Sequence, residues 1–355
     1  MNRVDRLIRK TALRGDAAIL IHKPSNMFYL SGYTGEGLLI IGHRFCAIVT
    51  DFRYVEQAQA QAPGFLVRSV SNERNHAQVT ADVLNENGIA SALYEDDFLT
   101  VRAAAQLAEA LGQIKLEALA NQPEALRQIK DAEEIALMEK ACGISSQAYE
   151  DICGWIKPGM SEIHIKRLLD NRLLELGAQA TAFSTIVASG PNGSLPHAVA
   201  GERVVQQGDM ITLDFGAQYK GYCSDMTRTI SLGQPSAKML EIFNIVLTAQ
   251  MACQDMLAPG KPCNGLDALA RSIIGEAGYG EYFGHGLGHA VGIDIHEAPR
   301  LSPKCEDDLV PGHVVTVEPG IYLPGIGGVR IENTCLITDG GARSLVKAPR
   351  ELRIL

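Results

Sequence analysis

The sequence predicts a two-domain protein, in which an α/β domain is followed by an α+β domain built from two similar halves. Three observations support this prediction. The chain has 355 residues, which is more than one domain usually contains. Its first third alternates short apolar runs with helical runs, and the remainder repeats one pattern of a helix followed by strands. We expect the first domain over residues 1–122 and the second over residues 123–355.

The first third has the pattern of one α/β domain. Two apolar runs bounded by glycine and polar residues predict strands, DAAILIHK at 16–23 and GLLIIGHRFCAIVTD at 37–51. Two runs rich in helix formers predict helices, RYVEQAQAQA at 53–62 and VRAAAQLAEALGQ at 101–113. The histidines of this region are isolated from one another in sequence, so we expect no catalytic cluster in the first domain.

A long helix is predicted from Pro123 onward. Its apolar stripe recurs at helical spacing and consists of Leu126, Ile129, Met138, Ala141 and Ile144. This change of pattern places the domain boundary near Asn121–Gln122.

The remainder of the chain contains an internal repeat. Nineteen residues separate Pro158 from Gly177, and nineteen separate Pro259 from Gly278. In both segments a Pro-Gly pair precedes a helical run that ends at a glycine, a residue suited to the left-handed position after a helix. A pair of strand-like runs follows each helix. The second domain is therefore predicted to have two halves related by an internal pseudo-twofold axis.

Composition excludes several kinds of partner. The formal net charge is −9, whereas nucleic acids and anionic membranes attract basic surfaces. No apolar run approaches the length of a membrane span, and the amino terminus lacks the apolar core of a secretory signal. The eight cysteines form no CxxC pair, so we expect reduced thiols and a cytoplasmic protein.

Two aspartates lie in the strand-like runs of the first half, DMITLDFGA and GYCSDMTRTISL. A hairpin centred at Tyr219-Lys220 would make Asp214 and Asp225 direct cross-strand partners, about 5 Å apart at Cβ. Like charges at that distance repel, and a bound cation removes the repulsion. The alternative is one aspartate near the turn and one in a salt bridge with Arg228.

The second half repeats this arrangement in GHVVTVEPGIYL and GGVRIENTCLITD. Glu318 ends the first of these strands and Glu332 lies in the second, with Arg330 two residues earlier on the same face. Each half thus supplies one carboxylate per strand. We expect the two pairs of carboxylates to face each other across the pseudo-twofold axis.

Three histidines lie in FGHGLGHAVGIDIHEAP, namely His285, His289 and His296. The segment is too rich in glycine for a stable helix, so we expect loop and strand. One imidazole added to four carboxylates makes a ligand set for two divalent ions, with Mn, Co and Zn as candidates.

These motifs resemble those of the pita-bread metallopeptidases, in the branch of the Xaa-Pro aminopeptidases and Xaa-Pro dipeptidases (prolidases). Five stretches carry the resemblance in the family's order: SGPNGSLPHA, TLDFGAQYKGYCSDMTRT, HGLGHAVGIDIHE, TVEPGIY and GVRIEN. The stretch NMFYLSGYTGEG resembles the creatinase-type N-terminal domain of that branch. The resemblance implies an α/β creatinase-like domain followed by an α+β pita-bread catalytic domain.

The resemblance also implies a role for each site residue. The implied metal ligands are Asp214, Asp225, His289, Glu318 and Glu332, with Asp225 and Glu332 bridging the two ions. The other implied catalytic residues are His296 for the substrate carbonyl, His285 and His197 in the pocket near the scissile bond, and Arg330 as the partner of an acidic neighbour. Glu318 would be ligand and base at once. Many relatives have a second histidine after the one at 197, where this chain has Ala198.

The implied activity is two-metal hydrolysis of an N-terminal Xaa-Pro bond. We expect an Xaa-Pro aminopeptidase, with an Xaa-Pro dipeptidase as the alternative, and manganese as the metal in preference to cobalt or zinc. The expected partners are a peptide with proline at its second position and, by resemblance, a second copy of the chain in a homodimer. A creatinase-like or non-catalytic relative of the same fold would lack metal ligands, and all five are present here. Methionine aminopeptidases usually lack the creatinase-like domain.

Overall fold

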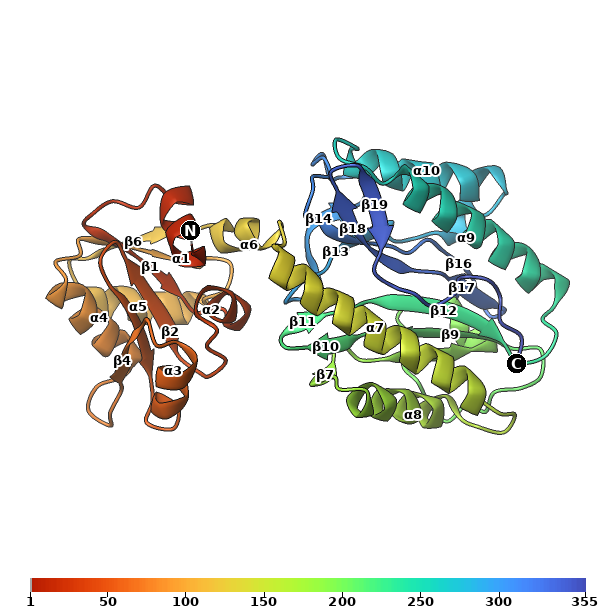
Figure 1. The fold of residues 1–355 in the computed structure, drawn as a ribbon, viewed down its shortest axis with the longest axis horizontal. Helices are drawn as coiled ribbons and strands as arrows, with labels where there is room; N and C mark the ends of the chain where they lie inside the picture. The colour runs from red at the N-terminus through yellow and green to blue at the C-terminus, as the bar shows by residue number, and fades with distance from the viewer. Residues whose placement is uncertain (1) are drawn as a thin grey trace. The chain divides into compact units, whose positions relative to one another are not determined.

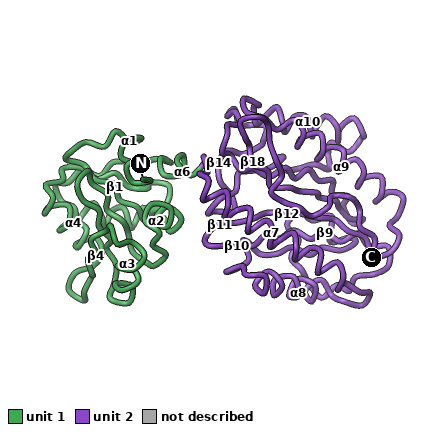
Figure 2. Tube along the Cα trace, viewed as in Figure 1, with its two compact units in different colours: residues 1–127 green, residues 128–355 purple. Residues whose placement is uncertain are grey.

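The protein is described by a computed structural model over residues 2–355, and the chain divides into two compact units (Figure 2). The first unit ends at Arg127, and the second runs Gln128–Leu355.

The first unit contains a six-stranded mixed sheet with the order β4-β3-β2-β1-β5-β6 (Figure 1). Its strands are β1 Ala17–Ile21, β2 Leu38–Gly42, β3 Cys46–Thr50, β4 Leu66–Ser69, β5 Ser91–Tyr94 and β6 Lys115–Ala118. The central strands β1 and β2 are buried along their whole length. A strand buried on both faces has no need of polar alternation, which is why their sequences are continuous apolar runs.

Six helices complete this unit. They are α1 Arg3–Lys10, α2 Pro24–Ser31, α3 Val55–Gln61, α4 His76–Glu86, α5 Val101–Leu111 and α6 Gln122–Arg127. The strands predicted at 16–23 and 37–51 correspond to β1, β2 and β3, and the predicted helices correspond to α3 and α5. The α/β architecture predicted for the first third is confirmed.

The prediction of a single long helix from Pro123 is wrong, because the structure has two helices there, α6 and a longer one that follows it. The short helix α6 packs against α1 and α2, which places the division of the units at 127 rather than at 122. The next helix begins at Ala132, where Asp131 and Glu134 form a reciprocal capping box. The intervening Lys130 is not helical, and its amide donates to the carbonyl of Gly312 instead (2.9 Å).

The second unit contains two pairs of long helices, which lie along opposite sides of the unit in Figure 1. They are α7 Ala132–Trp155 and α8 Glu162–Glu175 in the first half, and α9 Ala237–Met256 and α10 Cys263–Glu276 in the second. Two short 3₁₀ helices are η1 Gly190–Ser194 and η2 Gly280–Tyr282. The glycines that follow α8 and α10, Gly177 and Gly278, both have positive φ, as the repeat predicts.

The strands of the second unit repeat in the same way. The first half contains β7 Ala180–Thr181, β8 Ile186–Ser189, β9 Met210–Phe215, β10 Ala217–Tyr219, β11 Tyr222–Cys223 and β12 Met226–Ser231. The second half contains β13 Gly288–Ala290, β14 Glu297–Leu301, β15 Val314–Val317, β16 Gly320–Leu323, β17 Gly327–Arg330, β18 Asn333–Thr338 and β19 Gly341–Ser344. The order β12-β9-β8 in one sheet matches β18-β15-β13 in the other, which is the predicted duplication.

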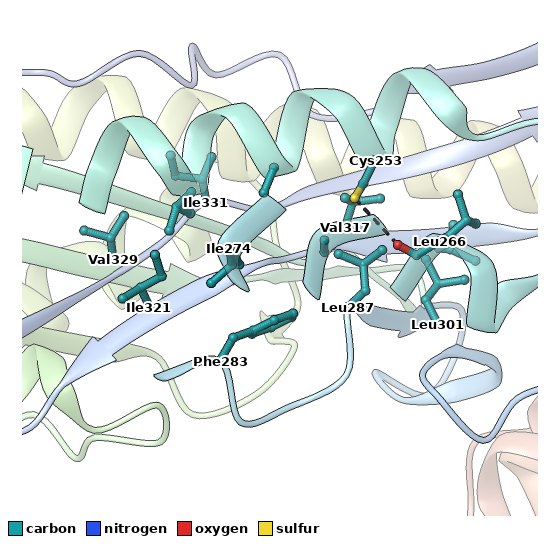
Figure 3. Packing of buried hydrophobic residues seen from close by; sticks show 14 of the residues in the cluster. Cys253, Leu266, Ile274, Phe283, Leu287, Leu301, Val317, Ile321, Val329 and Ile331 are labelled. Atoms are coloured by element: carbon teal, nitrogen blue, oxygen red, sulfur yellow. Dashed lines mark hydrogen bonds between the residues drawn. The ribbon is translucent and has the colours of Figure 1, made fainter. Parts of the chain in front are cut away.

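The largest apolar contacts of the second half lie between its helices and its strands (Figure 3). Val317, Ile321, Val329 and Ile331 are fully buried against α9 and α10. Burying an aliphatic side chain of this kind stabilises the fold by about 1.5–3 kcal/mol. This packing fixes the strand that carries Arg330 and the strands that flank Glu318 and Glu332.

All eight cysteines lie within the described residues, and each is a free thiol. No helix within residues 2–355 has both the length and the apolar character needed to cross a bilayer.

Candidate metal centre and catalytic cleft

A cleft of about 640 Å³ opens in the second unit, and all nine side chains predicted for the site line it. They are Asp214, Asp225, His289, Glu318, Glu332, His197, His285, His296 and Arg330. Both halves contribute, because β9, β12 and the loop after η1 belong to the first half and the other elements to the second.

The hairpin of the first half differs in register from the prediction. Asp214 is paired with Thr227 rather than with Asp225. The turn is centred at Lys220-Gly221, one residue later than expected, and both residues have positive φ (46° and 84°). Two adjacent residues with positive φ form a type I′ turn, which matches the twist of a hairpin. Asp225 therefore lies just before β12, where the ladder between the strands is interrupted.

The hairpin of the second half is interrupted at the equivalent place. The pairing of β15 with β18 ends at Val317 and Asn333, and the pairing of β16 with β17 begins at Gly320 and Arg330. Glu318 and Glu332 fall inside this gap. Their side chains are held by threonines, because Thr316 Oγ1 donates to Glu318 Oε1 (3.1 Å) and Thr227 Oγ1 donates to Glu332 Oε2 (2.7 Å).

His289 lies on β13, in the strand that the glycine-rich segment was expected to form. A Cβ on the preceding Gly288 would lie 2.2 Å from the carbonyl oxygen of Thr316, so only glycine permits this approach of the two strands. His289 Nδ1 donates to the carbonyl of Ala290 (3.1 Å), which leaves Nε2 as the lone-pair nitrogen. His289 Nε2 lies 3.6 Å from Asp225 Oδ2 and 3.4 Å from Glu318 Oε1.

The electrostatics of the cleft favour a bound cation. Burial, together with neighbouring carboxylates, raises the pKa of Asp225 and of Glu332 well above the ordinary range. Burial raises the pKa of Glu318 to about 7 and lowers the pKa of His289 to about 3. The cleft thus contains buried carboxylic acids that ionise poorly, next to a neutral imidazole. A divalent ion would offset the cost of ionising these carboxylates.

The donor set fits two divalent ions. Ligand atoms of Asp225, His289 and Glu332 lie within 4.8 Å of one another. Asp214 Oδ1 and Glu332 Oε1 are buried and have no hydrogen-bond partner among the described residues. Because buried carboxylate oxygens without partners are costly, these two atoms indicate where a cation belongs. Four carboxylates and one imidazole suit ions such as Mn, Co or Zn.

Arg330 connects the two halves. Its Nη2 lies 2.5 Å from Asp214 Oδ2, so the acidic partner expected for this arginine is a carboxylate of the first half. The same side chain donates to Thr227 Oγ1 (3.1 Å), to Tyr322 Oη (2.8 Å) and to the carbonyl of Pro196 (3.3 Å). Arg330 thereby fixes one carboxylate and the backbone next to His197 at the same time.

His285 lines the cleft, but both of its ring nitrogens have partners within the protein. Nδ1 donates to the carbonyl of Gly286 (2.8 Å), and Nε2 accepts from Tyr322 Oη (2.8 Å). Burial lowers the pKa of His285 to about 4, so the ring is neutral and fits this tautomer. The polar atoms of His285 therefore order the wall of the cleft, whereas the prediction had placed it simply as a pocket histidine.

His197 and His296 are exposed residues that line the cleft from opposite halves. The ring centroid of His296 lies 4.4 Å from that of His289, in an edge-to-face arrangement. Both side chains can therefore meet a substrate lying over the carboxylates.

Two buried carboxylates on the helices hold segments of the chain that carry histidines of the cleft. Glu162, at the start of α8, accepts hydrogen bonds from the amide and hydroxyl of Ser189, from Asn192 Nδ2 and from the amide of Gly201. Asp267, on α10, accepts from the amide of Leu287 (2.9 Å). The first carboxylate orders the loop with His197, and the second orders the segment between His285 and His289.

Several residues of the cleft were missed from the sequence. Arg300 and Lys166 line the cleft, whereas Thr227, Thr316 and Tyr322 bind side chains that line it. Thr316 lies two residues before Glu318, and this alternation along a strand was a usable signal. Tyr322 had no signal, because its role depends on β16 lying against the loop that carries His285.

The chain matches known families over most of its length. Residues 136–339 match Metallopeptidase family M24, and residues 3–129 match the Creatinase/Prolidase N-terminal domain. An Xaa-Pro dipeptidase of Pyrococcus furiosus is 37% identical over 99% of both chains.

Solved structures of similar proteins agree with this match. An Xaa-Pro dipeptidase from Bacillus anthracis is 42% identical, with a TM-score of 0.95 over 99% of both chains. An X-Pro aminopeptidase from Thermotoga maritima is 35% identical, with a TM-score of 0.91 over 98% of this chain and 100% of that one. The predicted creatinase-like and pita-bread architecture is confirmed by these neighbours. With its fold and these matches in agreement, the chain belongs to Metallopeptidase family M24 and carries the creatinase/prolidase type of N-terminal domain.

Proposed function

We propose that this chain is an Xaa-Pro dipeptidase that hydrolyses the bond before a carboxy-terminal proline with two divalent metal ions. The observation that carries the proposal is the convergence of Asp225, His289 and Glu332 at the cleft, beside buried carboxylate oxygens without partners. The metals would be held by these three residues together with Asp214 and Glu318. Manganese is the proposed ion, with cobalt and zinc as alternatives.

The dipeptidase replaces the aminopeptidase as our preferred activity for two reasons. Relatives named as Xaa-Pro dipeptidases match the chain over almost its full length. The cleft also contains a cation suited to a free carboxylate, because Arg300 is exposed, lines the cleft and is the cross-strand partner of His289. A guanidinium can bind both oxygens of a carboxylate, which a longer peptide would not present there.

In the proposed reaction, the metal ions would lower the pKa of a bound water and polarise the scissile carbonyl. The Glu318 carboxylate accepts a proton from the attacking water and delivers it to the proline nitrogen as the C–N bond breaks. His296 donates a ring N–H to the carbonyl oxygen as negative charge develops on it. Arg330 and Thr227 keep Asp214 and Glu332 in place through the hydrogen bonds described above.

A peptide assay tests the proposal. Mn-loaded protein is incubated with Ala-Pro, with Ala-Pro-amide and with a longer peptide that begins Ala-Pro, beside an EDTA-treated control, and products are followed by mass spectrometry. We expect metal-dependent cleavage of Ala-Pro alone. Release of alanine from the longer peptide would instead establish an aminopeptidase, the activity named for the Thermotoga maritima neighbour. Absence of metal-dependent cleavage of all three would reject both activities.

Substitution of Arg300 sharpens this test. We expect Arg300→Met to raise KM for Ala-Pro, because the carboxylate loses its partner. If the variant cleaves Ala-Pro like the original protein, another group must recognise the carboxylate.

We also propose that the enzyme is a cytoplasmic homodimer. The eight free thiols support a reducing compartment. Light scattering of the purified protein tests the dimer, and a monomer at micromolar concentration would reject it.

A further inference from the structure

A lysine of the first half occupies a wall of the cleft and is held there by an acidic partner. Lys166 lies on α8, and its side chain is 22% exposed. Its Nζ lies 2.5 Å from Asp170 Oδ2, and Asp170 Oδ1 accepts from Thr185 Oγ1 (2.5 Å). Lys166 and Thr185 line the cleft, whereas Asp170 lies behind them. An ammonium has three N–H donors, so the bond to Asp170 fixes Lys166 without using all of them.

The internal repeat has an equivalent pair with a different use. Residues 101 positions later in the repeat are Asp267 and Arg271, which form the same i,i+4 pair with the charges reversed. There the pair binds backbone groups: Asp267 accepts from Leu287, and Arg271 donates to the carbonyls of Phe283 and His285. Within residues 2–355, Lys166 has no hydrogen bond to a backbone group of this kind, and its side chain lines the cleft while its Nζ binds Asp170.

Two cations therefore lie at opposite ends of the ligand set. Arg300 is the cross-strand partner of His289, in the second half. Lys166 shares the carboxylate of Asp170 with Thr185, and the next residue, Ile186, is the cross-strand partner of Asp214, in the first half. If Arg300 takes the carboxylate of proline, as the proposed function requires, the first residue of the dipeptide lies at the Asp214 end.

We propose that Lys166 is a specificity-determining residue that favours dipeptides whose first residue carries a carboxylate, Glu-Pro and Asp-Pro. The inference rests on the proposed function and adds the substrate class. The side-chain carboxylate accepts a charge-assisted hydrogen bond from Lys166 Nζ. Phe183 and Ile186, which line the same wall, cover the methylene groups of the glutamate. Asp170 is a positioning residue, since it holds the ammonium at the wall.

The experiment compares kcat/KM for Glu-Pro, Gln-Pro and Ala-Pro, because glutamine has nearly the shape of glutamate without its charge. We expect the original protein to prefer Glu-Pro over Gln-Pro by about tenfold, as for a partly desolvated charge pair. The preference should shrink as NaCl is raised from low to high concentration, because exposed charges are screened. Lys166→Met should bring the ratio of Glu-Pro to Gln-Pro to about one and leave Ala-Pro within about twofold.

Three further variants separate the causes. Lys166→Arg keeps the charge and should keep the preference. The double variant Lys166→Met/Asp170→Asn removes both charges, so that a lost preference does not reflect repulsion by an uncovered Asp170. Arg167→Met is the matched control, because Arg167 is the neighbouring cation on α8, is exposed and does not line the cleft.

Each outcome decides the inference. A Glu-Pro to Gln-Pro ratio near one in the original protein, or a ratio unchanged in Lys166→Met, overturns it while cleavage of Ala-Pro keeps the proposed function. An equal loss for all three dipeptides in Lys166→Met also overturns it, because Lys166 would then hold the proline carboxylate. If even Ala-Pro is not cleaved by the metal-loaded original protein, the proposed function itself fails.

Discussion

The two halves of the catalytic unit share one architecture but supply different chemistry. The first half contributes two carboxylates, Asp214 and Asp225. The second contributes two carboxylates at equivalent places and, in addition, His289 and Arg330. Duplication of a hairpin with an interrupted ladder therefore accounts for the four carboxylates that line the cleft. The differences between the halves account for the imidazole of His289 and for the guanidinium that binds Asp214.

The largest effects are expected when one proposed metal ligand is removed from each half, which tests whether the two halves contribute equally to metal binding. We expect Asp225→Asn and Glu332→Gln each to lower kcat/KM for Ala-Pro by about a thousandfold or more, because loss of a metal is worth several kcal/mol in such sites. Steady-state kinetics and metal content by mass spectrometry measure the effect. If one variant keeps two metals and its activity while the other does not, the halves are not equivalent as ligands.

Substitution of the two exposed histidines, His296 and His197, should change different kinetic constants. We expect His296→Ala to lower kcat by about a hundredfold, since it removes a donor to the developing oxyanion. His197→Ala should act mainly on KM, because its side chain lines the cleft from the first half without a defined role in proton transfer. Steady-state kinetics of the two variants measure both constants. A lower kcat in His197→Ala together with a change of KM alone in His296→Ala would contradict this assignment.

The two helix carboxylates should have similar, smaller effects. In Glu162→Gln an amide nitrogen would face the donors of Asn192 and Gly201, and we expect the free energy of unfolding to fall by about 2 kcal/mol. Asp267→Asn should cost a similar amount, because it weakens the pair with Arg271. Thermal unfolding of the metal-loaded proteins gives the two values. Equal stability of the variants and the original protein would mean that the loops are held by other contacts.

The last prediction concerns pH in the metal-free protein. The pKa of Glu318 is raised to about 7, and those of Asp225 and Glu332 are raised well above the ordinary range, so the folded state binds more protons than the unfolded state above pH 6.5. Stability should therefore fall as pH rises from 6.5 to 8, by about 1.4 kcal/mol per pH unit for each extra proton that the folded state binds. Below pH 6.5 the lowered pKa of His289 acts in the opposite direction.

Thermal unfolding after dialysis against EDTA measures this dependence, and added Mn should remove it, because metal binding favours the ionised carboxylates. Stability that rises between pH 6.5 and 8 without metal would contradict the raised pKa values.

The duplication and the convergence of the five proposed ligands on one cleft were predictable from the sequence, since both depend on residues at regular places in the two repeats. The register of the first hairpin was not predicted correctly. Asp214 pairs with Thr227 because Lys220 and Gly221 both take positive φ, and an error of one residue at the turn moves a cross-strand partner by two. The start of a new helix at Ala132 could have been predicted, because Asp131 and Glu134 have the spacing of a capping box.

The surroundings of His285 were beyond prediction for a different reason. Its partner Tyr322 is 37 residues away, and no local pattern records that the two side chains meet. The same holds for the pairing of Arg330 with Asp214, 116 residues apart.

The fully buried Arg228 has a consequence for how the protein is made. Its guanidinium donates to the carbonyls of Thr227, Glu332, Ala348 and Pro349 and to Asn333 Oδ1, so it joins β12 to segments more than 100 residues later. During synthesis, the first hairpin cannot complete these bonds until residues 332–349 have left the ribosome. Contacts so distant in sequence form late and together. The nascent chain should therefore complete the cleft, and with it the proposed metal site, only once nearly all of the catalytic unit is available.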